Sequence, residues 1–328
     1  MALYNHPMKL IIQIPCYNEE ATLPQTLAAL PDSIPGFDSV EVLVVDDGSE
    51  DRTVEVAGEH GVDHIICLKQ HQGLARAFIS GLEACLSLGA DVIINTDADN
   101  QYSAECIPDL LSPIIQSEAD FVIGTRPIES IEHFSWLKKA LQVLGSRVVR
   151  AASQTSVMDA PSGFRAITRE AAMRLNIFSS YSYTLETLIQ AGHIGIATTS
   201  VPVEVNGEQR PSRLVKSLFS YVFKSAITIV RTYAIYKPFS FFLGIALLLF
   251  LPGFALGLRF LYYFFTGDGE GHVQSVILSV FLMSVGFSLA MMAILAELIA
   301  VNRQLIEKLS YRQQSMEVKR KKHTGTSK

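Results

Sequence analysis

Short apolar runs alternate with segments of helical periodicity along residues 1–125. The apolar runs predict strands at Leu10–Ile14, Val40–Val45, His64–Leu68, Val92–Asn95 and Phe121–Gly124. The amphipathic segments between them predict helices at Glu20–Leu30, Asp51–His60, Leu74–Leu88 and Ala104–Gln116. Such alternation is typical of an α/β fold, in which right-handed crossovers join a mostly parallel sheet.

The pattern is less regular from residue 131 to residue 205. It predicts a helix around Trp136–Ser153, a turn at "DAPSGFRA", two further helices and a strand near Ile196–Val203. The stretch 210–237 is basic, contains no acidic residue and interleaves aromatic residues. Beside an apolar segment, such a stretch predicts amphipathic helices in the lipid interface. The alternative is the solvated basic face of a soluble helix.

Two long apolar segments follow, at 238–265 and 273–301. Each exceeds the roughly 20 apolar residues that cross a bilayer, so together they predict a transmembrane hairpin. The polar residues between them include Asp268 and Glu270 but no Lys or Arg, whereas both outer flanks are basic. The positive-inside rule then places the globular part and both termini in the cytoplasm of an inner (plasma) membrane protein.

Five parts are therefore expected along the chain. They are a globular domain at 1–210, juxtamembrane amphipathic helices at 211–237, spans at 238–265 and 273–301, and a basic tail at 302–328. The hydrophobic content of 49% is concentrated in the spans, so the net charge of −5 averages over unlike regions. Four cysteines without a CxxC pair predict reduced, buried thiols. We expect membrane lipids as partners and no nucleic acid.

Asp97 and Asp99 follow the apolar run 92–95 directly, in "DADNQ". Neighbouring carboxylates repel each other, and a hard divalent cation removes that repulsion. If the chain stays extended, the side chains of Asp97, Asp99 and Gln101 point the same way. Three oxygen donors suit Mg²⁺ or Mn²⁺ better than zinc. The alternative is an acidic turn that caps the helix beginning at Ala104.

Polar motifs also follow the first, second and fifth predicted strands, as "PCYNEE", "DDGSED" and "GTRP". Ligands collect at the carboxyl ends of parallel strands. Asp46 and Asp47 can accept an N–H of uracil or guanine or hold a ribose hydroxyl, while Ser49 or Asp51 can instead cap the next helix. Because no glycine-rich phosphate loop is present, a metal would have to hold any phosphates. His71 and His193 are assigned no role.

The motifs P-x-Y-N-E, V-V-D-D-G-S, D-A-D-x-Q and G-[ST]-R, at these intervals, resemble those of the family 2 glycosyltransferases of GT-A fold. More narrowly, residues 8–216 resemble the polyprenyl-phosphate sugar transferases, such as dolichol-phosphate mannose synthases and bacterial polyprenyl-phosphate glucosyltransferases. The membrane hairpin is similar to that of the bacterial group. The resemblance implies a nucleotide sugar as donor and polyprenyl phosphate as acceptor.

The resemblance also implies roles on the donor side. Pro15, Tyr17, Glu19 and Asp47 would line the base and ribose; Asp97 and Ala98 would contact the ribose and diphosphate; Asp99 and Gln101 would ligate the metal. Arg126 would reach the diphosphate and stabilise the leaving group together with the metal.

On the acceptor side, residues 159–165 resemble the motif D-x-x-S-G-F-[RK], which implies that Asp159 and Ser162 lie near the acceptor. Lys138 would meet the lipid phosphate. Ser212 and Arg213 match the end of the family's basic loop R-x-x-G-x-S-K, with Arg213 expected to act in catalysis, whereas Arg210 is displaced from the motif's arginine. Asp159 is either a general base or an orienter of Lys138 or Arg165.

These expectations predict an inverting transferase that moves glucose from UDP-glucose to polyprenyl phosphate and gives a β-linked product. The alternatives are a GDP-mannose-dependent mannosyltransferase, a processive polysaccharide synthase and a membrane sensor that binds nucleotide without turnover. A processive synthase usually carries Q-x-x-R-W and more spans, and this sequence shows neither. We also expect a homo-oligomer.

Overall fold

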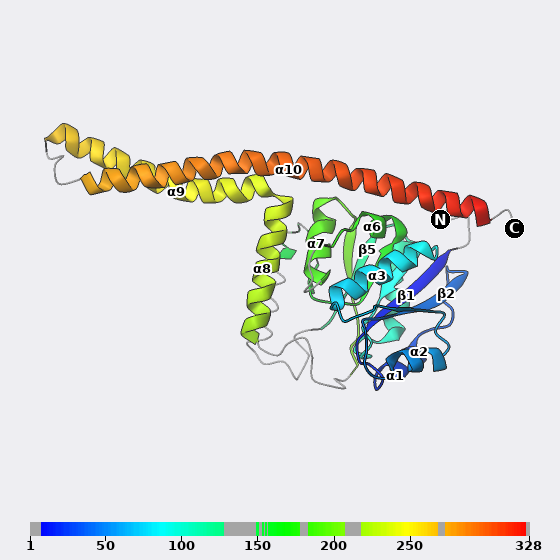
Figure 1. Ribbon diagram of the computed structural model, residues 1–328. Coiled ribbons are helices and arrows are strands. Elements are labelled where there is room, and N and C mark those ends of the chain that lie inside the picture. The colour runs from blue at the N-terminus through cyan, green and yellow to red at the C-terminus, as the bar shows by residue number, and fades with distance from the viewer. Residues whose placement is uncertain are drawn as a thin grey trace. The chain divides into compact units, whose positions relative to one another are not determined.

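The computed structural model describes residues 8–127, 149–150, 153, 155, 157–177, 183–206, 218–267 and 273–325. The chain divides into two compact units. The first comprises Met1–Ile229 together with Tyr311–Lys328, and the second comprises Val230–Ser310. The first unit holds an α/β domain and the second holds long apolar helices (Figure 1).

A seven-stranded sheet with the order β3-β2-β1-β4-β6-β5-β7 forms the centre of the α/β domain. Its strands are β1 (Lys9–Cys16), β2 (Ser39–Asp46), β3 (His64–Cys67), β4 (Val92–Asn95), β5 (Phe121–Thr125), β6 (Arg165–Thr168) and β7 (Thr198–Pro202). Strand β6 runs antiparallel to both of its neighbours, and all other pairs are parallel. The carboxyl ends of β1, β2, β4 and β5 therefore lie at one edge, where β6 begins.

Helices cover both faces of the sheet, which explains the continuous apolar character of its central strands. They are α1 (Leu23–Ala29), α2 (Thr53–Glu59), α3 (Leu74–Ser87), α4 (Ile107–Ile115), α6 (Arg169–Arg174) and α7 (Tyr183–His193), with a 3₁₀ turn at Ala104–Cys106. Leu10, Ile12 and Ile14 of β1 pack into one core with residues of α1 and α4. Gln13 points to the other face, where Gly81 of α3 approaches it closely.

The predicted fold class is confirmed, and the five strands and four helices expected in residues 1–125 are present with shifts of a few residues at their ends. The strand expected near 196–203 is β7, and the two further helices are α6 and α7. Strand β6 was missed, because its first two residues, Arg165 and Ala166, fall inside the turn expected at "DAPSGFRA". Most of the helix expected at Trp136–Ser153 lies outside the described residues.

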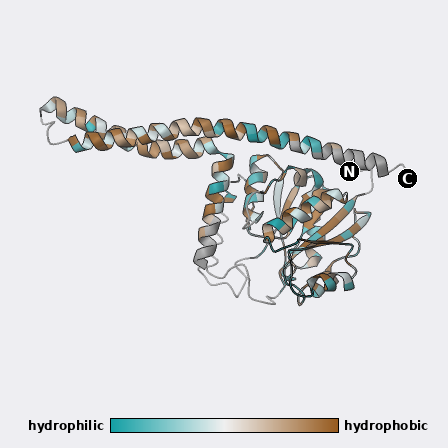
Figure 2. Cartoon of the chain, viewed as in Figure 1, coloured by the Kyte–Doolittle hydropathy of each residue, from teal (hydrophilic) through white to brown (hydrophobic). Residues whose placement is uncertain are grey.

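Among the described residues, two helices are long and apolar enough to cross a membrane, Pro238–Thr266 and Val273–Gln313, with mean hydropathies of 2.4 and 2.3. Both lie entirely or mainly in the second unit. Helix α8 (Leu218–Tyr236) precedes them, and the helices themselves are α9 (Pro238–Thr266) and α10 (Val273–Gly325). Figure 2 shows hydrophobic positions along α9 and the first part of α10. Because α10 continues to Gly325, the expected basic tail at 302–328 is largely helical.

Small residues bring α9 and α10 into close contact. The Ser279 hydroxyl donates to the carbonyl of Gly253 at 2.6 Å. A Cβ added at Gly253 would lie 3.1 Å from the backbone nitrogen of Met283, and one at Gly257 would lie 2.9 Å from Ser279 Oγ. The GxxxG sequence of α9 therefore packs inside the hairpin. Self-association of the chain stays a prediction.

We expect Gly253→Leu to lower the Tm of the full-length protein in detergent, because the added side chain forces α9 and α10 apart; overpacking costs about 1–3 kcal/mol. Gly244→Leu on the same helix is the matched control, since a Cβ there meets no atom within 4 Å. Equal Tm values for the two variants, measured by thermal denaturation, would contradict this packing.

Candidate active site

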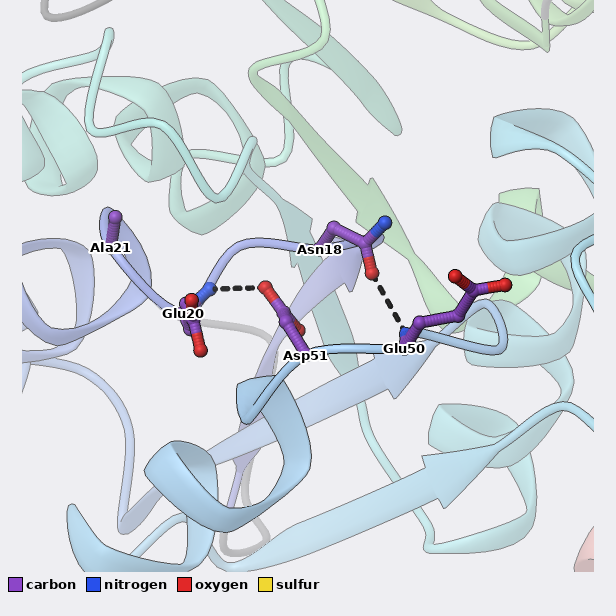
Figure 3. Close-up of a pocket in the computed structure, with 5 residues that line it drawn as sticks. All are labelled: Asn18, Glu20, Ala21, Glu50 and Asp51. Atoms are coloured by element: carbon purple, nitrogen blue, oxygen red, sulfur yellow. Dashed lines mark hydrogen bonds between the residues drawn. The ribbon is translucent and has the colours of Figure 1, made fainter.

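The loops that follow β1 and β2 are held together by reciprocal hydrogen bonds. Side chains in each loop accept from backbone N–H groups of the other (Figure 3). The bonds run from Asn18 N to Ser49 Oγ (2.9 Å), Glu50 N to Asn18 Oδ1 (2.8 Å), Glu20 N to Asp51 Oδ2 (3.2 Å) and Arg52 N to Glu20 Oε2 (3.1 Å). This network fixes Tyr17 and Asp47, one in each loop, relative to each other.

A pocket of about 300 Å³ lies between the same loops and is lined by Asn18, Glu20, Ala21, Glu50 and Asp51 (Figure 3). Three of the five lining residues are acidic, which disfavours a phosphate group there. Glu19 lies in the same loop, between the lining residues Asn18 and Glu20. Its carboxylate accepts from the Thr22 hydroxyl at 2.6 Å, and its N–H donates to Thr53 Oγ1 at 2.8 Å.

Asp47 anchors the loop that leads into α3. Its side chain is 3% exposed, and its carboxylate accepts from the N–H groups of Gln72 (2.8 Å) and Gly73 (2.7 Å). Its Oδ2 also lies 2.8 Å from His71 Nδ1. Gly48 has a φ of 73°, and a Cβ there would lie 2.8 Å from His71 N, so this close approach requires glycine.

His71 joins two of the predicted donor-site residues. Its ring stacks on Tyr17 with a centroid distance of 3.8 Å, and its Nδ1 faces Asp47. Sequence reasoning missed this residue, because a single histidine in a loop carries no local signal. The contact arises from the topology, which pairs β2 with β3 and so places their following loops side by side.

The turn that carries Asp97 and Asp99 differs from the extended segment that the sequence analysis assumed. Strand β4 ends at Asn95, and Asn100 adopts a left-handed conformation with a φ of 52°. Gln101 N donates to Asp99 Oδ1 at 3.1 Å, as in an Asx turn. The expectation that strand alternation aligns positions 97, 99 and 101 is therefore wrong, because the strand has already ended.

Two surrounding segments hold this turn. The Thr26 hydroxyl of α1 donates to the carbonyl of Ala98 at 2.9 Å. Asn206 donates from its backbone to Gln101 O and from its side chain to Asn100 O, each at 2.9 Å. Asn206 directly precedes the part of the basic loop that carries Arg210 and Arg213. Those two arginines and Lys138 lie outside the described residues.

Asp97 lies in an electrostatically unfavourable position for a carboxylate. Burial and the neighbouring charge of Asp99 raise the pKa of Asp97 to about 7, although Arg126 and Arg165 act in the opposite direction. Gly163 lies directly against this carboxylate, since a Cβ there would be 2.8 Å from both of its oxygens. A bound cation would relieve the repulsion between the two aspartates.

The carboxylates of Asp97 and Asp99 fit Mg²⁺ or Mn²⁺, which proteins bind through one or two carboxylates together with substrate phosphates and water. Within the described part of the chain, no three His, Cys, Asp or Glu side chains converge on a common metal position. A cation at Asp97 and Asp99 would therefore take its other ligands from an amide oxygen, water or the donor's phosphates.

Arg126 and Asp159 form a bidentate ion pair at the same edge. Arg126 Nε lies 2.7 Å from Asp159 Oδ2, and Nη2 lies 3.0 Å from Oδ1, with side-chain exposures of 10% and 0%. The guanidinium carbon is 6.0 Å from the centre of the Tyr102 ring. The structure thus gives Asp159 a partner that the sequence analysis did not consider, since Lys138 and Arg165 were the orienting partners expected there.

Arg165 and Tyr102 shape the segment around Ser162 and Gly163. The fully buried Arg165 donates to the carbonyls of Ala160, Ser162 and Thr184 and to the Thr187 hydroxyl. The Tyr102 hydroxyl accepts from Gly163 N at 3.0 Å and lies 3.5 Å from Ser162 Oγ, which is itself fully buried. Tyr102 was another residue that the sequence analysis missed.

A mostly parallel sheet whose carboxyl edge gathers paired acids and a buried arginine defines a glycosyltransferase domain of GT-A fold. Among solved structures, it is similar to glucosyl-3-phosphoglycerate synthase from Mycobacterium tuberculosis in complex with Mn²⁺, UDP and glucosyl-3-phosphoglycerate. The TM-score is 0.56 at 19% identity, over 69% of this chain and 80% of that chain. Residues 11–175 match Glycosyl transferase family 2, and the chain belongs to this family.

Curated relatives extend over much of the same domain. The chain is 31% identical to an undecaprenyl-phosphate mannosyltransferase of Micrococcus luteus, over 60% of this chain and 83% of the relative. It is 26% identical to a polyprenol monophosphomannose synthase of Mycolicibacterium smegmatis, over 59% of this chain and 76% of the relative.

We expect Gly163→Ala to slow sugar transfer roughly 10- to 100-fold, because the new Cβ displaces the Asp97 carboxylate, and small misplacements in an active site cost this much. Stability should change little, since the side chain of Asp97 can move. Gly58→Ala in α2, where a Cβ meets no atom within 4 Å, is the control. Initial rates and Tm values of both variants measure the effect; an unchanged rate for Gly163→Ala would contradict it.

We expect Asp159→Ala to destabilise the protein by about 3–5 kcal/mol, because it leaves the nearly buried Arg126 without its partner. Arg126→Ala should cost a similar amount, and the double variant less than the sum. The exposed pair Arg52–Glu55 provides the control variant Arg52→Ala, for which little change is expected. Urea unfolding of the full chain in detergent gives the values, and strict additivity would contradict a tight pair.

Proposed function

We propose that the protein transfers a hexose from a nucleotide diphosphate sugar to polyprenyl phosphate at the cytoplasmic face of the plasma (inner) membrane. The single observation that carries this proposal is the turn with Asp97 and Asp99 beside the buried Arg126–Asp159 pair. The two candidate membrane spans of the chain support a lipid acceptor. The named relatives support a polyprenyl phosphate acceptor.

On the donor side, Asp97, Asp99 and Gln101 are proposed to hold Mg²⁺ or Mn²⁺. When bound, the ion supplies positive charge next to the leaving diphosphate. Arg126, held in one orientation by Asp159, supplies a second positive charge without reorganisation during the reaction. Pro15, Tyr17, Glu19 and Asp47 are proposed to belong to the part of the site that holds the base and ribose, and Ala98 to the part that holds the ribose and diphosphate.

On the acceptor side, Lys138, Ser162, Arg210 and Arg213 are proposed to hold the lipid phosphate. A phosphate is anionic at neutral pH, so it can attack the sugar without a strong base, and a single displacement inverts the anomeric carbon. Both oxygens of Asp159 accept from Arg126, which favours an orienting role over that of a proton acceptor. Arg213 is proposed to neutralise the attacking phosphate.

The membrane arrangement completes the proposal. The basic flanks of the two candidate spans support a topology with the catalytic domain and both termini in the cytoplasm. On α8, the side chains of Phe223, Ile227 and Val230 are 58%, 50% and 52% exposed and recur at helical spacing. We infer that this apolar stripe of α8 lies in the lipid interface.

The donor is proposed to be UDP-glucose, with GDP-mannose as the second candidate because the relatives' names specify mannose. A panel of UDP-glucose, GDP-mannose, UDP-galactose and UDP-N-acetylglucosamine, each incubated with polyprenyl phosphate, tests this choice. One labelled donor should yield a glycolipid. A polymer would instead support a processive synthase, and nucleotide binding without any product would support a sensor.

Metal dependence has its own test on the donor identified by the panel. EDTA should abolish transfer and Mn²⁺ should restore it, and Asp99→Ala should lower the rate roughly 10²–10³-fold, the usual loss for one charge-stabilising group. Asp109→Ala, which removes an exposed carboxylate from the first turn of α4, is the control. Full turnover of Asp99→Ala would rule out the proposed metal site.

A further inference from the structure

The carboxylate of Asp47 is committed to the protein itself. A carboxylate offers about four lone-pair sites. Two of those sites accept the N–H groups of Gln72 and Gly73, and a third faces His71 Nδ1 at 2.8 Å. With a side chain only 3% exposed, Asp47 has little capacity left to contact a nucleoside directly.

His71 has the opposite character, because it is fixed in place yet half exposed. Asp47 Oδ2 is an acceptor, so the imidazole nitrogen Nδ1 carries the proton in the neutral ring and Nε2 is left as an acceptor. In the described part of the chain, no group bonds to Nε2, and the side chain is 51% exposed. The Tyr17 ring, inclined by 25° at 3.8 Å, sets the plane of the imidazole.

A polar ring held by a buried carboxylate and by a stacked aromatic ring is preorganised for binding, because little side-chain entropy is lost when a ligand arrives. Both residues that hold His71 are proposed to belong to the nucleoside side of the donor site. The backbone of the loop is equally constrained, since Gly48 allows its close approach to the turn at Asp47.

We infer that His71 is a nucleoside-binding residue of the donor site, whose imidazole Nε2 accepts a hydrogen bond from the nucleoside. The inference rests on the proposed function. The hydrogen-bond donor is either a ring N–H of the base or a ribose hydroxyl, because both have the chemistry that a neutral imidazole nitrogen recognises. Asp47 is then a positioning residue that acts through His71.

The first test measures binding of UDP and of GDP, each with Mn²⁺, to the full-length protein by calorimetry. His71→Asn keeps an N–H donor for Asp47 but removes the acceptor at Nε2, and we expect about a tenfold rise in Kd for the nucleotide that the wild type binds. His60→Asn is the matched control, since the His60 imidazole contacts the Val56 carbonyl of its own helix end, at 2.9 Å, and no residue of the proposed site. An unchanged Kd for His71→Asn overturns the inference.

Nucleotide analogues separate a direct contact from a structural effect. They are the N-methylated base, the 2′-deoxy and the 3′-deoxy forms of the same nucleotide. One analogue should bind the wild type about tenfold more weakly than its parent nucleotide, yet bind His71→Asn as well as the parent does. The N-methylated form identifies the base as the source, and a deoxy form identifies the ribose.

Each failure has a distinct meaning. If the ratio of each analogue's Kd to that of its parent nucleotide is the same in the wild type and in His71→Asn, His71 makes no direct contact. The inference is then wrong, while the proposed function stands. If the wild type binds neither UDP nor GDP, the proposed function falls, and the inference falls with it.

Discussion

Negative charge concentrated at the carboxyl edge of the sheet is the constraint on which the site depends. Burial and Asp99 raise the pKa of Asp97 to about 7, so the folded protein holds this proton at pH values where the unfolded chain has lost it. The free energy of unfolding therefore falls as the pH rises from the pKa of Asp97 in the unfolded chain to its pKa of about 7 in the folded protein. Arg126 and Arg165 offset part of the repulsion, and each is held by the protein in turn.

The same constraint explains why carboxylates at this edge are difficult to interpret from sequence. A buried carboxylate must be paired or hydrogen-bonded, whether or not a ligand ever reaches it. Glu19 accepts from Thr22, Asp47 accepts from the loop before α3, and Asp159 accepts from Arg126. The residue type and the strand-end position predict that such a group has a partner. They do not predict whether the partner is a ligand or the protein.

Sequence patterns predicted most of the sheet, because β1, β2 and β4 are largely buried and so appear as mainly apolar runs, interrupted only by Gln13 in β1 and Glu41 in β2. Strand β6 was missed, since it begins with a buried arginine that bonds to carbonyl groups across the fold. The end of β4 at Asn95 was predicted, but the turn that follows was not, because the left-handed conformation of Asn100 leaves no mark on hydrophobic periodicity. Tyr102 and His71 gain their contacts only through the topology, so local sequence could not identify them.

Within the second unit, polarity is distributed as the proposed function requires. The small residues of α9 are used against α10, and Ser279 satisfies its hydroxyl on the Gly253 carbonyl, so the contact between the helices needs no water. Leu248 and Phe265, at 71% and 80% exposure, leave an apolar outer surface that lipid can cover. A polyprenyl phosphate is confined to the bilayer, and an enzyme confined to the same bilayer meets it at a raised effective concentration. The hairpin can therefore serve the reaction as an anchor alone, and recognition of the acceptor can rest on its phosphate.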